Sequence, residues 1–86
     1  MTKSIYSPQM QALTGWLRAN RENQGLTMRD LAGRLGKPHS YVQRVESGER
    51  RLDVVEYVWY CTALDVPPTD GIEVVAGFCS PAIGKK

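Results

Sequence analysis

The stretch from Thr27 to Gly48 constrains the fold more than any other part of the chain, because it divides into two short helical patterns around a glycine. Thr27 suits an N-cap position, and Asp30 can reach back to it as a short capping box. Gly36 suits the left-handed residue that ends a helix, and the proline two residues later marks the start of the next helix. Two helices of about nine residues, joined by a glycine-containing turn, predict a helix-turn-helix.

Each of these two helices has one apolar side. In the first helix, apolar side chains recur at helical spacing at Leu31, Ala32 and Leu35. In the second helix, Val42 and Val45 share an inward face. We therefore expect the second helix to carry a polar outward face, which consists of His39, Ser40, Gln43 and Arg44.

A further helix is predicted before this stretch. It begins at Pro8 with Ser7 as its N-cap and ends at about Asn23. Its expected inward side chains are Met10, Leu13, Trp16 and Leu17.

Two more helices are predicted after the stretch. The first is capped by Asp53 and ended by Asp65 in a left-handed conformation, and Leu52 anchors its start to the core. Its expected inward side chains are Val54, Tyr57, Val58, Cys61 and Leu64. The last helix begins at Pro68 or Thr69. One of its faces is expected to carry Ile72, Val75 and Phe78. The chain is thus predicted to be all-α, with a flexible N-terminal arm at 1–7, a helical domain at 8–79 and a flexible tail at 80–86.

Composition excludes several other classes of protein. Eighty-six residues with seven aromatic side chains suit one small folded domain. No apolar run approaches the roughly 18 residues that span a membrane, and the N-terminus lacks a signal-peptide core, so we expect a cytoplasmic protein without a membrane partner. Cys61 and Cys79, with a single histidine, predict neither a zinc site nor a disulfide framework, and nothing indicates a cofactor.

Charge is distributed unevenly along the chain. Residues 29–51 contain six basic and three acidic side chains, whereas residues 52–84 contain five acidic and no basic ones. A positive centre and a negative C-terminal third suit a molecule that presents one side to a polyanion, although random surface variation is an alternative explanation.

Several runs of the sequence match the pattern of a known family. They are L-T-M-R-D-L-A from Leu26, R-L-G at 34–36, Y-V-Q-R-V-E-S-G-E-R from Tyr41, R-R-L-D-V-V-E from Arg50, and A-L-D-V-P-P from Ala63. On these runs, about residues 13–68, the chain resembles the lambda-repressor-like (Cro/Xre) DNA-binding domains. The resemblance implies a compact five-helix fold, with a helix-turn-helix at the second and third helices. It also implies a regulator of transcription, expected to be a repressor that binds a palindromic operator, whose partner is double-stranded DNA.

The resemblance also implies roles for individual side chains. The first residues of the second motif helix would enter the major groove, and the base-reading positions match His39, Ser40, Gln43 and Arg44. Phosphate contacts would come from Arg29, Lys37, Arg50 and Arg51. In both sets the alternative is a solvated polar surface. The chain departs from the family at Met28, where glutamine is common, and at Pro38, where a capping serine or threonine is common.

An ion pair and a dimer surface complete these expectations. In the family, an arginine of the first helix pairs with a glutamate at the end of the reading helix, and Arg21 and Glu46 stand at these positions. An exposed Trp59 suggests a contact surface on the last two helices. We expect a homodimer through Val55, Trp59, Ile72 and Val75, whereas the alternative is an indole that covers its own domain.

Three other functions remain open from the sequence. An antitoxin would use the same DNA-binding domain and also bind a protein toxin. A protein-interaction module on the same fold would bind no DNA. An enzyme is the least favoured, because no nucleophile–base pair, metal site or phosphate-binding glycine loop is recognisable.

Overall fold

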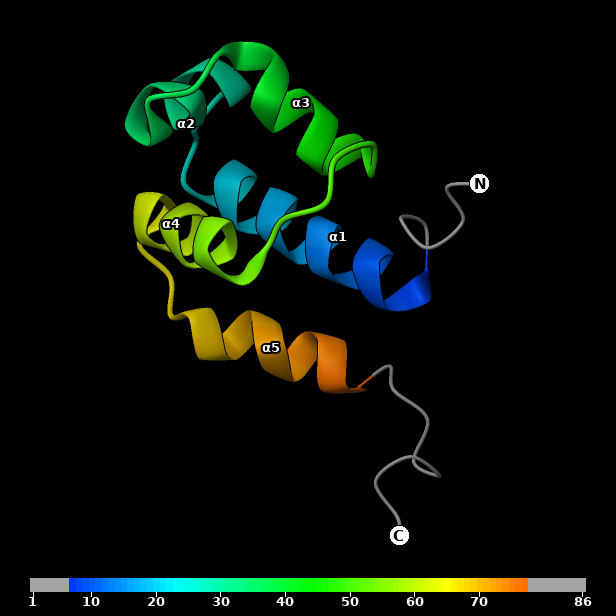
Figure 1. Ribbon diagram of the computed structural model, residues 1–86. Coiled ribbons are helices and arrows are strands. Elements are labelled where there is room, and N and C mark those ends of the chain that lie inside the picture. Colours follow the sequence, from blue (N-terminus) through cyan, green and yellow to red (C-terminus); the bar gives the residue numbers. More distant parts are fainter. Residues whose placement is uncertain (1–6, 78–86) are drawn as a thin grey trace, which may run out of the picture.

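A computed structural model describes residues 7–77, which form five α-helices and contain no strand. The helices are α1 (Pro8–Asn23), α2 (Met28–Leu35), α3 (His39–Ser47), α4 (Val54–Leu64) and α5 (Pro68–Gly77) (Figure 1). The prediction of an all-α domain with a helix-turn-helix at its second and third helices is confirmed. The predicted tail, Phe78, Cys79 and all of the predicted arm except Ser7 lie outside the described residues. None of the helices within 7–77 is long and apolar enough to cross a membrane.

The helix starts follow the predicted capping chemistry. The Ser7 hydroxyl accepts a hydrogen bond from the Met10 N–H at 3.1 Å. Thr27 and Asp30 form a complete capping box, in which each side chain accepts a hydrogen bond from the backbone of the other residue. Hydrogen bonds from Thr27 also lower the pKa of the Asp30 carboxyl. Asp53 and Glu56 form a second capping box at the start of α4.

Left-handed residues end three of the helices. Gly36 ends α2 with φ 67°, and Gly48 ends α3 with φ 83°. Asp65 ends α4 with φ 58°. Within residues 7–77 it is the one residue other than glycine that has a positive φ. Because Asp tolerates this region better than most side chains, the predicted turn survives without glycine.

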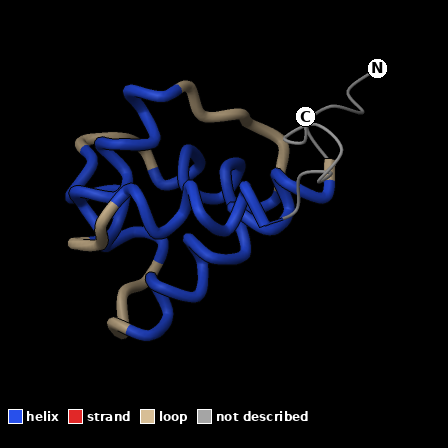
Figure 2. The backbone as a smooth tube through the Cα atoms, turned by 90° about the horizontal axis from the view of Figure 1, so that it is seen from below, coloured by secondary structure: helices blue, strands red, loops and turns tan. Residues whose placement is uncertain are grey.

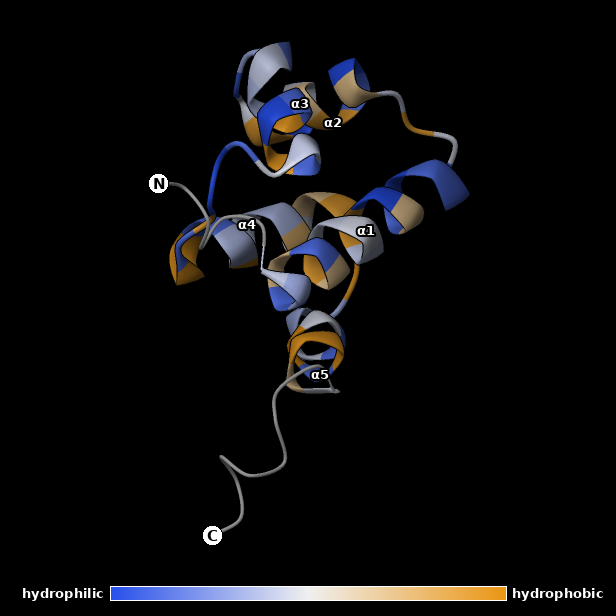
Figure 3. Cartoon of the chain, turned by 90° about the vertical axis from the view of Figure 1, so that its right-hand side faces the viewer, coloured by the Kyte–Doolittle hydropathy of each residue, from blue (hydrophilic) through white to orange (hydrophobic). Residues whose placement is uncertain are grey.

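The helices stack in three layers (Figures 1 and 3). The pair α2–α3 lies at one end of the molecule, α1 and α4 lie in the middle, and α5 lies at the other end. Helices make up most of the described backbone, and the longest connecting loop, residues 48–53, runs from α3 to α4 (Figure 2). This arrangement leaves the outer side of α3 far from α5.

The core forms where the two outer layers meet α1 and α4. It consists of Leu13, Leu17, Leu31, Ala32, Tyr41, Val42, Val45, Tyr57, Tyr60, Cys61 and Leu64. Met10, Trp16, Leu35 and Leu52 are partly buried and pack against it. Most of the predicted inward side chains therefore lie inside.

Two predictions for α4 are wrong. Val54 and Val58 were expected to face the core, but they are exposed, Val54 by 77%. The inward face is instead made by Tyr57, Tyr60, Cys61 and Leu64. Because a helix buries a limited arc, the two tyrosines fill the arc and turn both valines outward.

The close approach of α5 to α1 depends on Gly71. This residue is buried, and a Cβ built there would lie 2.7 Å from Cζ3 of Trp16 and would also collide with the Tyr57 hydroxyl. That hydroxyl donates a hydrogen bond to the Pro68 carbonyl at the start of α5. The glycine therefore lets α5 lie flat on the middle layer.

Gly71→Ala is expected to lower the free energy of unfolding by about 1–3 kcal/mol, because the added methyl group overpacks this contact. Chemical denaturation monitored by circular dichroism measures the change. Gly15→Ala is the matched control: it lies inside α1 with nothing within 4 Å of its Cβ position, so it should raise stability by up to about 1 kcal/mol. Equal effects of the two substitutions would contradict the packing role of Gly71.

Candidate nucleic-acid interface

The outward face of α3 is polar and uncovered within the described chain. His39, Ser40, Gln43 and Arg44 are all exposed, whereas Tyr41, Val42 and Val45 on the opposite side are buried. The structure thus brings the four predicted base-reading residues together on one side of a short helix at one end of the molecule (Figure 1). Their guanidinium, amide, hydroxyl and imidazole groups can form hydrogen bonds with base edges.

The C-terminal end of α3 is fixed by a buried ion pair. Nε and Nη2 of Arg21 donate to the two carboxylate oxygens of Glu46 at 2.6 and 3.0 Å, and Nη1 donates to the Leu26 carbonyl at 2.8 Å. The two side chains are only 8% and 4% exposed. The hydrogen bonds to Glu46 raise the pKa of Arg21. Because the Arg21 guanidinium and the Glu46 carboxylate neutralise each other, the pair holds the inward side of α3 on α1.

The N-terminal end of α3 has no side-chain cap. Pro38 occupies the N-cap position and, as the sequence suggested, supplies no capping hydrogen bond. The backbone N–H of Tyr41 instead donates to the Pro38 carbonyl at 2.9 Å. Met28, at the other departure from the family pattern, is half-buried and packs against the core.

The four predicted phosphate-binding residues differ in their surroundings. Arg29, in the first turn of α2, is exposed, as are Lys37 in the turn and Arg51 in the loop. Arg50 is only partly exposed, because its guanidinium forms an ion pair with Glu56 of α4. Arg50 is thus more buried than the other three cations.

The four predicted dimer residues differ in their exposure. Val55, Trp59 and Ile72 are exposed, but Val75 is half-buried and packs against the core of its own chain. Ile72 and Val75 line an apolar groove of about 220 Å³ together with Val54. Five large apolar side chains are exposed in the described chain, and all belong to α4 or α5: Val54, Val55, Val58, Trp59 and Ile72.

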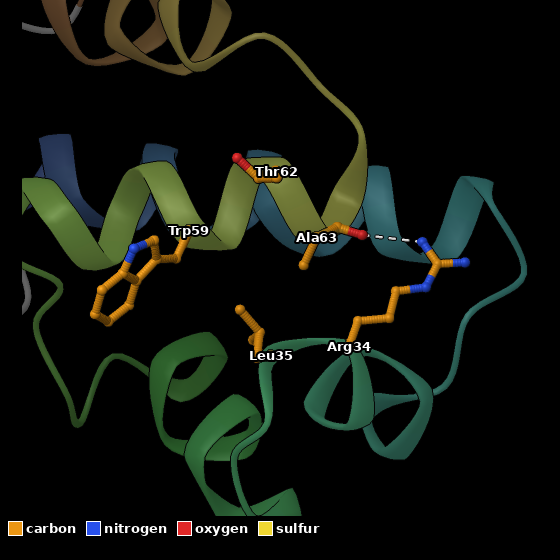
Figure 4. A pocket seen from close by; sticks show the side chains of 5 residues that line it. All are labelled: Arg34, Leu35, Trp59, Thr62 and Ala63. Carbon is orange, nitrogen blue, oxygen red and sulfur yellow. Dashed lines mark hydrogen bonds between the residues drawn. The ribbon is translucent and has the colours of Figure 1, made fainter.

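Trp59 lies in a second groove, on the α2 side of α4. This groove of about 270 Å³ is lined by Arg34, Leu35, Trp59, Thr62 and Ala63 (Figure 4). Arg34 donates a hydrogen bond to the Ala63 carbonyl at 2.9 Å, so a side chain of α2 satisfies the C-terminal end of α4. The exposed indole therefore lies beside α2, in a groove shared with the helix-turn-helix.

Several residues near α3 were missed by the sequence analysis. Tyr41 lies under Arg50 and beside the buried Tyr60, and Glu56 neutralises Arg50. Only the spacing of Glu56 three residues after Asp53, which suits a capping box, could have drawn attention to it. Within residues 7–77, no three histidine, cysteine, aspartate or glutamate side chains lie close enough together to hold a metal ion.

Glu46→Gln is expected to lower the free energy of unfolding by about 3–5 kcal/mol, because it leaves the buried Arg21 charge without its partner. Urea denaturation measures this change. Arg18→Gln provides the control: it breaks an exposed pair with Glu22 and should change stability by less than about 1 kcal/mol. A small effect of Glu46→Gln would show that the pair does not anchor α3.

The comparisons with known proteins agree with this geometry. The helix-turn-helix family model matches residues 17–70. A solved structure of an XRE-family like protein from Pseudomonas syringae pv. tomato is 35% identical, has a TM-score of 0.79, and aligns over 92% of this chain and 96% of that one. Among curated protein sequences, none matches this chain.

Two further solved structures are regulators by name. The restriction-modification controller protein C.AhdI from Aeromonas hydrophila is 32% identical with a TM-score of 0.70, over 76% of this chain and 98% of that chain. The clp gene regulator ClgR from Corynebacterium glutamicum is 26% identical with a TM-score of 0.74, over 86% and 96%. With a family model that covers most of the helical domain, the chain belongs to the Cro/Xre type of helix-turn-helix DNA-binding proteins.

Proposed function

We propose that this chain represses transcription by binding a palindromic operator as a homodimer, with α3 in the major groove. DNA-binding regulation of transcription follows from the family and from the regulators that the fold resembles. The observation that carries the finer proposal is the polar face of α3, which is exposed along its length while Arg21 and Glu46 hold the helix from behind.

The base-reading chemistry is divided among four side chains. Arg44 offers two donors to guanine O6 and N7, and Gln43 can pair with adenine. Ser40 can donate or accept, and His39 starts the helix next to them. Since all four project from one short helix, they would meet neighbouring base pairs in one groove.

Phosphate contacts would come from exposed cations around this face. Arg29 lies in the first turn of α2, where the free N–H groups also favour an anion. Lys37 and Arg51 flank α3 in the chain. Arg50 differs, because it already pairs with Glu56.

A homodimer through the outer side of α4 and α5 would leave α3 uncovered. The exposed apolar side chains there, especially Val55, Val58 and Ile72, form the type of surface that marks a protein contact. In a dimer, two α3 helices about 34 Å apart would meet successive turns of the major groove. One subunit alone offers few base contacts, so pairing would provide specificity. A toxin partner stays a prediction from the sequence.

Arg44→Ala is expected to weaken binding to the cognate duplex by about 1–3 kcal/mol and to leave binding to a scrambled duplex nearly unchanged. The cognate duplex is recovered by selection from a random pool with the wild-type protein, and fluorescence anisotropy measures both affinities. Arg51→Ala is the control, which should weaken both complexes and reduce the salt slope by about one unit. If Arg44→Ala weakened both duplexes equally, it would not read bases.

Val55→Lys is expected to shift the protein from dimer to monomer, because it places a charge in the apolar contact. Analytical ultracentrifugation at several concentrations measures the change, and circular dichroism checks the fold. Ala19→Lys, at an exposed position of α1, is the matched control and should leave the dimer intact. A wild-type protein that sediments as a monomer at all concentrations, with or without its duplex, would refute the dimer.

A further inference from the structure

The first turn of α3 lacks the usual means of fixing its position. Its N-cap residue Pro38 provides no side-chain hydrogen bond, and the ion pair of Glu46 lies at the opposite end of the helix. His39 and Ser40 nevertheless stand in this turn, where a small displacement would move them relative to a base edge. Something else must therefore set the position of the turn.

Tyr41 and Val42 are the buried side chains of that turn, and the ring of Tyr41 is the one that meets α4 and the loop after α3. This ring lies 6.4 Å from the ring of Tyr60 on α4, measured between centroids. Cζ of Arg50 lies 5.1 Å from the Tyr41 ring centroid, and Nζ of Lys37 lies 5.5 Å from it. The ring is thus packed against α4 and contacted by two cations, an arrangement that favours aromatic–cation attraction.

Arg50 is itself held by α4. Its Nη2 donates to Oε2 of Glu56, and the two side chains are 41% and 15% exposed. Oε1 of the same carboxylate accepts the Asp53 N–H at 3.1 Å and completes the capping box of α4. Because Glu56 is fixed by the backbone, the guanidinium over Tyr41 is fixed as well.

We propose that Tyr41, Arg50 and Glu56 form a latch that positions the base-reading turn of α3 against α4. Arg50 is then a positioning residue, and the loop that carries it joins the reading helix to the middle layer of the molecule. To contact a phosphate, this guanidinium would have to leave a carboxylate and an aromatic ring. Arg51, its neighbour in the loop, is more exposed than Arg50.

Amide hydrogen exchange of the free protein tests the latch without DNA. Arg50→Gln and Glu56→Gln should each accelerate exchange at the amides of residues 41–43 by at least about fivefold, because the first turn opens locally. Glutamine at position 56 keeps the capping interaction, so α4 itself should stay folded. Arg51→Gln is the matched control and should leave the exchange of these amides unchanged. In all three variants, exchange of the Glu46 amide, at the other end of α3, should also stay unchanged. Unchanged exchange in Arg50→Gln and Glu56→Gln would overturn the proposal.

A second measurement, which rests on the proposed function, uses the selected duplex and a scrambled duplex of equal length. The latch predicts that Arg50→Gln and Glu56→Gln each lower the ratio of the two affinities by about five- to tenfold. The double variant should lower this ratio no further than either single variant, because each substitution already breaks the same Arg50–Glu56 contact. Arg50→Lys should not restore the ratio, since lysine lacks the planar guanidinium.

A phosphate contact gives the opposite pattern. Arg50→Gln would then weaken both duplexes and reduce the salt slope by about one unit, whereas Glu56→Gln would preserve the affinity ratio. That result would overturn the latch. A wild-type protein that selects no duplex would instead refute the proposed function, and hydrogen exchange would still decide the latch.

Discussion

The buried ion pair between Arg21 and Glu46 is the interaction on which the exposed position of α3 depends. The three core side chains of α3 anchor it hydrophobically, but a short helix with a polar outer face has little other area to bury. The bidentate pair adds directional bonds at one end, and the third bond of Arg21, to the Leu26 carbonyl, extends the anchor to the segment before α2. The same arginine therefore ties both motif helices to α1.

Layering separates the charges of the chain in space as the sequence separates them along its length. Arg29, Lys37 and Arg51 lie on or beside the α2–α3 layer, whereas Asp70 and Glu73 lie on α5 at the other end. The polyanion would consequently meet the positive end first, with the acidic end directed away. A modest net charge of +2 is sufficient for this orientation because the distribution matters more than the sum.

Local chemistry made the helix boundaries predictable. The caps at Ser7, Thr27 and Asp53 use neighbours within three residues, so the sequence contains both partners. The register of α4 was less accessible, because Tyr60 and the two exposed valines are all apolar, and periodicity alone does not rank them. The link from Arg50 to Glu56 depends on how a loop folds back onto the next helix, and no pattern of spacing specifies that.

The different faces of α4 have different surroundings: one contacts the start of α3, and another is exposed. One side packs Tyr60 against Tyr41 of α3, and Glu56 holds Arg50 over the same ring. The outer side carries Val55, which precedes Glu56 in the sequence, and Val58, which lies between Glu56 and Tyr60. Because a helix moves as a rigid unit, any partner that shifts α4 from outside would also shift the start of α3. Pairing of two chains and the position of the reading turn would then be linked by mechanical contact, without a separate effector site.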